Sequence, residues 1–252
     1  MDDLRPKTNE IKAVFFDFMG TCLDWHSSVV QALPTGLSEE EKSNLALEWR
    51  QAFFNAIRAR PPGELPENID TTHRRVLLQV LARPANVSIA HYFQTGDADQ
   101  NTAVELAVQA WHKMNAWPDV RPGLERIKSE CKGCEVFVLA NGTTRLQLDL
   151  VRSSGLDFDM LFSSELLGVA KPSPAIYRKA MELIQIKNPC QAVMVAAHAY
   201  DLRAAKEVGM KTIYIKRWTD DLDELDAERI LHENEGNVLG DFEGLSRIIA
   251  NF

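Results

Sequence analysis

The chain has 252 residues, of which 45% are hydrophobic and 25% are charged. These values are ordinary for a globular protein and exclude an intrinsically disordered or fibrous chain. The formal net charge of -8 argues against a general nucleic-acid-binding protein, because binding to phosphates needs a basic surface.

The sequence also lacks the marks of a membrane or exported protein. No apolar run approaches the roughly 20 residues that a bilayer span needs, and the first ten residues, MDDLRPKTNE, are too polar for a signal peptide. We therefore expect a cytoplasmic protein that has neither a membrane nor a nucleic acid as partner.

Four short apolar runs predict the strands of a sheet: residues 12–18, 135–141, 192–198 and 211–217. The first three are dense in valine or phenylalanine and barely alternate with polar residues, which is typical of strands buried on both faces. A helix-like stretch that ends at Gly209 precedes the fourth run. Strands that alternate with helices predict an α/β fold with a doubly wound parallel sheet.

A helical insertion separates the first two strand-like runs. Residues 39–59 and 101–115 have apolar positions at helical spacing, and the breaker-rich segment 60–68 divides them. The acidic stretch after residue 218 is expected to be a solvated loop or helix. We predict two domains, a core formed by residues 1–27 and 119–252 and an inserted helical domain formed by residues 28–118.

The four cysteines do not form a disulfide or zinc framework. Cys131 and Cys134 make one C-x-x-C pair, whereas Cys22 and Cys190 stand alone. A zinc site would need a second pair of cysteines or histidines at suitable spacing. We predict reduced cysteines and no metal site.

Polar residues follow the strand-like runs, where ligands bind in open α/β sheets. Asp17 ends the first run, Asn141 ends the second, and His198 and Asp201 follow the third. An aspartate whose stem is held by a strand can act as a nucleophile, and Lys171 could stabilise its negative charge. Each residue alone has a plain alternative, since Asp17 could cap a turn and Lys171 could be solvated. Together they predict one active site.

These residues lie in four motifs, DFMGT (17–21), ANG (140–142), AKPSPAIY (170–177) and AAHAYD (196–201). The set resembles the haloacid dehalogenase superfamily of hydrolases over nearly the whole chain. The resemblance implies a Rossmann-like core, with the helical insertion as the family's cap domain.

Two positions distinguish the branches of this superfamily. Most members are magnesium-dependent phosphatases with a proton-transferring aspartate two positions after the nucleophile and a metal-binding aspartate in the fourth motif. Here these positions hold Met19 and Ala197, and methionine cannot transfer a proton. The L-2-haloacid dehalogenases lack both aspartates, because halide leaves without a proton and no metal is required. The segment Trp49-Arg50-Gln51 also resembles the sequence around the substrate-binding arginine of that branch.

The resemblance therefore implies a hydrolase of carbon–halide bonds that acts on a small 2-haloalkanoic acid without a cofactor. Asp17 would form an ester with the substrate, and Asp201 would orient Lys171 or activate water. Tyr177 would hydrogen-bond within this network, and homodimers are common in the branch. The implied catalytic residues are Asp17, Lys171, Asp201 and Thr21, and the implied substrate-binding residues are Arg50, Asn141, Met19, Gln51, Phe54, Tyr177, His198 and Tyr200.

Several positions depart from the resembling branch, which has tyrosine at the position of Met19, serine at those of Ala140 and Ala196, and asparagine at that of His198. We expect intact core chemistry with altered substrate recognition. His198 could bind an anion, accept a proton from water, or simply pack. Two alternatives stay open: a phosphatase with a reduced magnesium site, and a catalytically silent homologue that binds a ligand or partner.

Overall fold

The computed structural model describes residues 10–59, 67–94, 100–224 and 226–252. The chain divides into two compact units, unit 1 (Met1–Leu23 and Ala116–Phe252) and unit 2 (Asp24–Asn115). The boundaries expected from the sequence, at residues 28 and 118, lie within four residues of this division. The strands β2 (Leu23–Asp24) and β3 (Asn115–Ala116) pair where the chain passes from one unit to the other.

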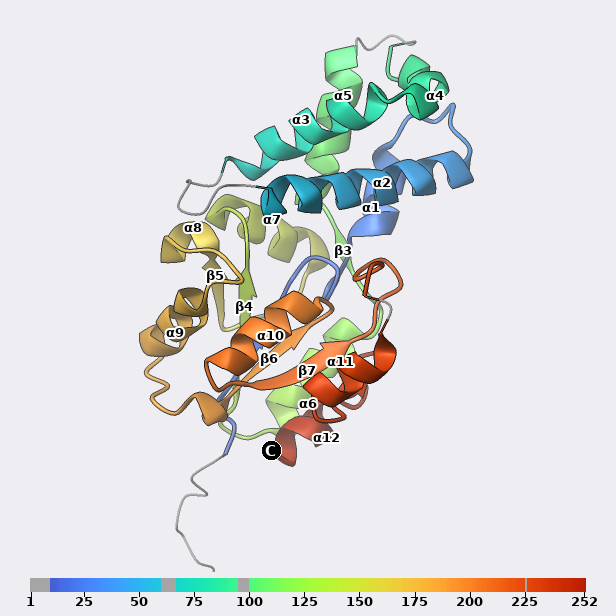
Figure 1. The fold of residues 1–252 in the computed structure, drawn as a ribbon. Helices are drawn as coiled ribbons and strands as arrows, with labels where there is room; N and C mark the ends of the chain where they lie inside the picture. Colours follow the sequence, from blue (N-terminus) through green and yellow to red (C-terminus); the bar gives the residue numbers. More distant parts are fainter. Residues whose placement is uncertain (1–9, 60–66, 95–99, 225) are drawn as a thin grey trace, which may run out of the picture. The chain divides into compact units, whose positions relative to one another are not determined.

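Unit 1 contains the predicted parallel sheet (Figure 1). All its strand pairs are parallel, which confirms the doubly wound α/β fold. The four predicted strands are present, although each is shorter than its apolar run. The two short strands at the edges of the sheet were not predicted, because their few residues lack a dense apolar run. Within the described residues the six strands lie in the order β5 (Met160–Ser163), β4 (Glu135–Ala140), β1 (Ala13–Phe16), β6 (Ala192–Ala196), β7 (Lys211–Ile215) and β8 (Val238–Leu239).

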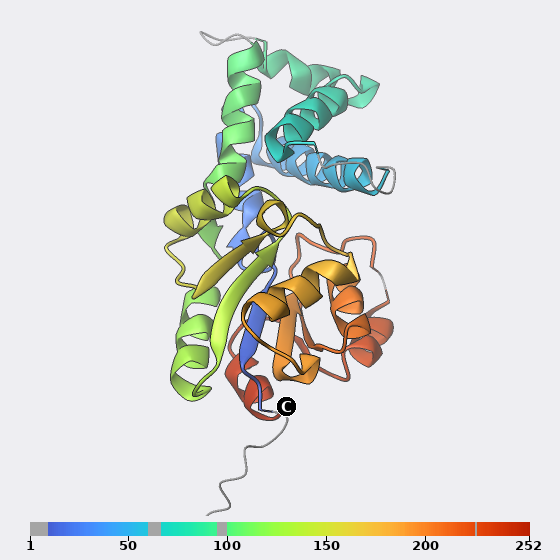
Figure 2. The ribbon, with the colours of Figure 1, turned by 90° about the vertical axis from the view of Figure 1, so that its left-hand side faces the viewer.

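Helices cover both faces of this sheet (Figure 2). Successive side chains of a strand point to opposite faces, so neighbouring residues of β1 enter different halves of the core. Helices α9 and α10 contribute to the half around Phe15, and α6 and α12 lie on the side of Phe16. The helical segments of unit 1 are α6 (Val120–Glu130), α7 (Thr144–Ser154), α8 (Ser164–Leu167), α9 (Pro174–Leu183), η3 (Pro189–Gln191), α10 (Ala199–Glu207), α11 (Ala227–Glu233) and α12 (Leu245–Ala250).

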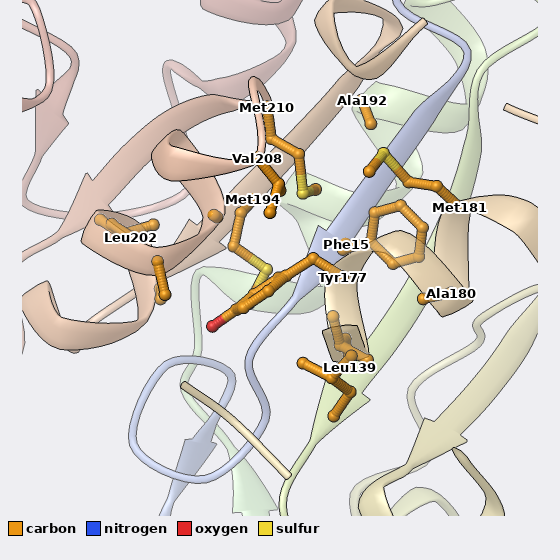
Figure 3. Packing of buried hydrophobic residues seen from close by; sticks show 14 of the residues in the cluster. Phe15, Leu139, Tyr177, Ala180, Met181, Ala192, Met194, Leu202, Val208 and Met210 are labelled. Carbon is orange, nitrogen blue, oxygen red and sulfur yellow. The ribbon is translucent and has the colours of Figure 1, made fainter. Parts of the chain in front are cut away.

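Aromatic packing fixes the central strand on both sides. The ring centroid of Phe15 lies 5.3 Å from that of Phe137, and Tyr177 belongs to the same buried cluster (Figure 3). On the other face, the ring of Phe16 stacks on Phe242 at 5.5 Å. Burial of such rings dominates core energetics, at about 25 cal/mol per Å² of apolar surface. The end of β1 is therefore a rigid support for Asp17, which follows it.

Unit 2 is helical in its described part. Ser38 and Glu41 form a capping box at the start of α2, with the Glu41 backbone N–H donating to the Ser38 hydroxyl at 3.3 Å. Trp25, Trp49 and Trp111 are fully buried and form its aromatic centre. Residues 60–66 of the predicted breaker segment lie outside the described residues. The helical segments are α1 (Trp25–Ala32), α2 (Glu39–Arg58), α3 (Ile69–Leu81), η1 (Pro84–Asn86), α4 (Val87–Tyr92), α5 (Gln100–Gln109) and η2 (Ala110–His112).

One prediction from the sequence is wrong in part. The acidic stretch after residue 218 was expected to be solvated, but Thr219 and Asp220 are buried. They turn inward because the Asp220 carboxylate has a cationic partner in the core, which compensates the cost of removing its charge from water. The four cysteines are free thiols, as predicted, and no helix of the described chain is long and apolar enough to cross a membrane.

Candidate active site

The carboxyl ends of three neighbouring strands bring polar residues of unit 1 together. Asp17 directly follows β1, Asn141 follows β4, and His198 follows β6 at the start of α10. Because β1 lies between β4 and β6, the three residues meet at the same edge of the sheet.

Asp17 is buried and surrounded by donors. The Lys171 ammonium donates to Asp17 Oδ1 at 2.7 Å, and the Thr21 hydroxyl donates to Oδ2 at 2.8 Å. Thr21 Oγ1 in turn accepts the backbone N–H of Ala197 at 2.8 Å, so its proton is free to point at Asp17. Burial opposes ionisation of Asp17, but the positive charges of Lys171 and His198 outweigh it and hold the pKa of this carboxyl well below its ordinary value. The carboxylate is therefore ionised at neutral pH.

A tight turn makes this arrangement possible. Gly20 has φ +86°, a conformation that side-chain-bearing residues rarely adopt. The turn brings Thr21 back over Asp17, four residues earlier in the chain.

Lys171 joins the nucleophile to a second carboxylate. Its Nζ donates to Asp201 Oδ2 at 2.5 Å, and the Tyr177 hydroxyl donates to Asp201 Oδ1 at 2.5 Å. Burial lowers the pKa of Lys171, but the adjacent Asp17 and Asp201 carboxylates raise it above its ordinary value. Burial, with the Asp201 charge, also raises the pKa of Tyr177, so the phenol stays protonated. Lys171 is thus a fixed cation between two acids.

Two predicted substrate-binding residues, Asn141 and Tyr177, take part in this hydrogen-bond network. The Asn141 amide nitrogen donates to the Lys171 carbonyl at 3.0 Å, and the Lys171 backbone N–H donates to the Asn141 side-chain oxygen at 2.8 Å. Asn141 therefore fixes the loop that carries the lysine. Tyr177 is fully buried behind Asp201.

His198 lies between two carboxylates. Its Nδ1 is 3.1 Å from Asp17 Oδ2, and its Nε2 is 3.0 Å from Asp220 Oδ1. Burial disfavours the charged imidazolium, but hydrogen bonds to Asp17 and Asp220 raise the pKa of His198 to about 10. The ring is therefore protonated at neutral pH.

Asp220 was not among the residues predicted from the sequence. It follows β7, so the rule that singled out Asp17 and His198 at strand ends also applied to it. Asp220 was missed because it lies within an acidic stretch that was expected to be solvated. The loop is held in place because the Thr219 hydroxyl donates to Asp220 Oδ2 at 2.7 Å.

Met19 and Tyr200 lie beside these groups in unit 1. Met19 is half-buried in the turn after Asp17, where it bridges to Leu23. The ring centroid of Tyr200, on α10, is 5.7 Å from that of His198, and 36% of this residue is exposed. Met19 and Tyr200 remain predicted substrate contacts.

The remaining predicted residues belong to α2 of unit 2. Arg50 is buried, and its guanidinium carbon lies 4.5 Å from the ring centroid of Phe54, 5.3 Å from that of Trp25 and 5.4 Å from that of Trp111. A guanidinium suits such surroundings because it is planar, weakly hydrated and attracted to aromatic faces. The neighbouring Gln51 donates to Asn55 at 3.4 Å. Arg50 and Phe54 thus form one contact within unit 2.

The donor set does not fit the magnesium ion that phosphatases of this fold use. Mg²⁺ needs oxygen ligands in near-octahedral geometry, usually including carboxylates. The space between Asp17 and Asp201 is filled by the Lys171 ammonium, and the described residues contain no group of three or more acidic, histidine or cysteine side chains suited to a metal ion.

The chain is similar to a known hydrolase family in both sequence and structure. Residues 11–209 match the family model of haloacid dehalogenase-like hydrolases. The chain is 27% identical over 216 residues to (S)-2-haloacid dehalogenase 4A of Burkholderia cepacia, covering 83% of this chain and 84% of the relative. It is 28% identical over 217 residues to glyceraldehyde 3-phosphate phosphatase of Pyrococcus furiosus, covering 82% and 81%. A crystal structure of an L-2-haloacid dehalogenase superposes with a TM-score of 0.75 at 30% identity and covers 95% of this chain and 100% of that one. These matches confirm the family resemblance seen in the sequence.

Proposed function

Because the chain belongs to the haloacid dehalogenase-like hydrolases, we propose that it hydrolyses the carbon–halogen bond of a small 2-haloalkanoic acid through an ester on Asp17. The observation that carries this proposal is the ionised Asp17 paired with Lys171 at 2.7 Å, in a turn that places Met19 where a phosphatase would need a proton donor. A halide leaves as a stable anion, so the missing donor does not hinder this reaction.

In the first step, a carboxylate oxygen of Asp17 attacks C2 of the substrate from the side opposite the halogen. The new carbon–oxygen bond forms as the carbon–halogen bond breaks, and the electron pair of that bond leaves with the halide. Lys171 and Thr21 hold the carboxylate in one orientation, which reduces the entropy lost on reaching the transition state.

In the second step, water adds to the carboxyl carbon of Asp17 and the bond to the substrate oxygen breaks. The water oxygen remains on Asp17, one proton of the water goes to the hydroxyl of the 2-hydroxy acid, and the other is released to solvent. Asp201 accepts from both Lys171 and Tyr177, and so it orients the lysine that neutralises Asp17.

We assign binding of the substrate carboxylate or the departing halide to Arg50. This part of the proposal comes from the resemblance of the Trp49-Arg50-Gln51 segment and from the environment of Arg50 in unit 2. The rings of Trp25, Phe54 and Trp111 lie around the buried guanidinium and orient it through cation–π contacts.

The test is release of halide from L- and D-2-chloropropionate, L- and D-2-bromopropionate and the haloacetates, with EDTA present. Wild-type protein is expected to release halide, and Asp17→Asn is expected to lose at least about 10⁴-fold in rate, as when other nucleophiles are removed. Asp157→Asn is the matched control, because the Asp157 side chain is 90% exposed. A single turnover in ¹⁸O-water should label Asp17 and leave the product hydroxyl unlabelled. Absence of both halide release and label would refute the proposal.

The phosphatase alternative is supported by the identity to glyceraldehyde 3-phosphate phosphatase. It predicts phosphate release from small phosphate esters that requires Mg²⁺ and disappears in Asp17→Asn. That result, with no halide release, would replace the proposed function. No turnover of either substrate class would favour the silent homologue.

A further inference from the structure

The two oxygens of Asp17 have different environments. Oδ1 accepts from the Lys171 ammonium at 2.7 Å. Oδ2 accepts from the Thr21 hydroxyl at 2.8 Å and faces Nδ1 of His198 at 3.1 Å. Two donors from separate parts of the chain thus converge on Oδ2.

Asp220 secures His198 from the far side of the ring. Its side chain is completely shielded from solvent, and it lies 3.0 Å from His198 Nε2. The turn at Gly20 packs so closely on this carboxylate that a Cβ at residue 20 would lie 2.5 Å from it. Removing a carboxylate from water is unfavourable unless a positive charge compensates it, and His198 supplies that charge to Asp220 Oδ1.

The charges around His198 favour the imidazolium. The groups that face it are Asp17 beyond β1, Asp220 and Asp221 beyond β7, and Tyr200 on α10, with Lys171 on the opposite side of Asp17. With both ring nitrogens directed at carboxylates, the state that satisfies both contacts has a proton on each nitrogen. The pKa of about 10 agrees with this geometry.

We propose that His198 and Thr21 form the oxyanion site for hydrolysis of the Asp17 ester, and that Asp220 is the positioning residue that keeps His198 cationic and aimed at Asp17 Oδ2. This inference rests on the proposed function. It assigns Oδ1 as the oxygen that attacks the substrate and Oδ2 as the carbonyl oxygen of the ester.

The second step then places charge where these donors lie. When water adds to the carboxyl carbon, the electron pair of the carbonyl bond moves to Oδ2, which becomes an oxyanion facing Thr21 and the imidazolium. The oxyanion collapses, the bond from the carboxyl carbon to Oδ1 breaks, and Lys171 lies beside the oxygen that takes up that electron pair. The first step builds no new charge on Oδ2. Loss of His198 should therefore slow hydrolysis more than alkylation, because one oxyanion donor is worth about 10²–10³-fold in rate.

The experiment is quenched-flow with L-2-bromopropionate, in which bromide reports alkylation and the mass of intact protein reports the Asp17 ester. His198→Ala is expected to release about one equivalent of bromide rapidly and then turn over at least about 10²-fold more slowly than wild type, with the ester accumulating. His198→Asn, which keeps a neutral donor, should lie between the two. His232→Asn, at an exposed histidine, is the control.

Asp220→Asn tests positioning through pH. Ester formation removes the negative charge of Asp17, so during ester hydrolysis Asp220 is the carboxylate in contact with His198 that favours its proton. The wild-type rate of ester hydrolysis should fall where His198 loses that proton, and in the variant this fall should begin at a lower pH. A purely structural role of Asp220 would lower the rate by the same factor at every pH.

Three outcomes would overturn the inference. They are an unchanged hydrolysis rate in His198→Ala, a slower alkylation without ester accumulation, and an alkaline limb in Asp220→Asn identical to that of wild type. Histidine NMR separates this failure from failure of the proposed function. If the pKa of His198 in the wild-type protein is near its ordinary value of 6.5, the inference that Asp220 keeps His198 charged is refuted, whatever the substrate. If His198 is charged but the protein forms no ester, the proposed function is refuted.

Discussion

Two buried histidines, one in each unit, show how surroundings decide the charge of the same side chain. His198 in unit 1 lies between Asp17 and Asp220, and these contacts raise its pKa to about 10 despite burial. His73 in unit 2 is stacked between Phe53 and Trp111, each at 4.0 Å between ring centroids. Burial, with the nearby positive charge of Arg50, holds the pKa of His73 well below 6.5. Burial disfavours both cations, so the partners alone account for the opposite outcome.

The buried cations repeat this contrast. Lys171 donates to two carboxylates, and Arg50 contacts three aromatic rings. Lys171 lowers the pKa of Asp17, the proposed nucleophile, because its positive charge lies beside that carboxylate. The aromatic surroundings of Arg50 suit a guanidinium, because it is planar, weakly hydrated and attracted to ring faces. The buried cation of unit 1 is thus paired with acids, and the buried cation of unit 2 packs against aromatic rings.

Among the predicted effects, we expect the largest from removal of Lys171, the buried cation of unit 1. Lys171→Met leaves Asp17 and Asp201 buried against one another without a positive charge between them. We expect a loss of about 3–5 kcal/mol in the free energy of unfolding, as for other broken buried ion pairs, and loss of detectable halide release. Urea unfolding monitored by circular dichroism measures the stability. Lys187→Met, at an exposed lysine, is the control; a Lys171→Met protein as stable as that control would contradict the account.

A single substitution made at both histidines should have unequal effects. His198→Phe removes the cationic partner of the buried Asp220, so we expect a loss of about 3 kcal/mol. His73→Phe should stay within about 1 kcal/mol of wild type, because neither ring nitrogen of His73 has a hydrogen-bond partner in the described chain and a ring still fills the stack. The pair is compared in one set of urea titrations. A larger loss at residue 73 than at residue 198 would reverse the interpretation.

Smaller effects are expected from pH, with opposite signs in the two units. His73 is neutral when folded, so its contribution to stability is present above its ordinary pKa of 6.5 and is lost as the pH falls below that value. His198 is charged when folded, so its contribution is fully present below pH 6.5 and is lost as the pH rises through about 10. Each contribution changes by at most about 1.4 kcal/mol per pH unit.

Hydrogen exchange of peptides from α3 and α10 would measure this difference between the units. Exchange of α3 should increase from pH 7.5 to pH 5, after correction for the intrinsic rate, and His73→Phe should abolish the increase. Exchange of α10 should increase from pH 7.5 to pH 10. If exchange of α3 and α10 changed in the same direction at pH 5 or at pH 10, the two histidines would not be the cause of the pH dependence of stability.

The sequence alone was sufficient for the four inner strands of the parallel sheet and for most of the acid–lysine cluster. Dense apolar runs identify strands buried on both faces, and the carboxyl ends of such strands necessarily share an edge, so Asp17, His198 and Asp201 could be brought together without coordinates. The identity of the residues at 19 and 197 was enough to weaken the phosphatase hypothesis. Local patterns determine these features, because each depends on neighbours close in the chain.

Only the tertiary structure decided which polar groups pair. Asp220 lies in an acidic stretch that the sequence presents as solvated, and it became part of the site because the loop after β7 packs on the turn at Gly20. The side chain of Asn141 forms two hydrogen bonds with the backbone of Lys171, thirty residues later in the chain. His198 and His73 are the same residue type in the sequence, and their charges differ because only folding places carboxylates beside one and aromatic rings beside the other.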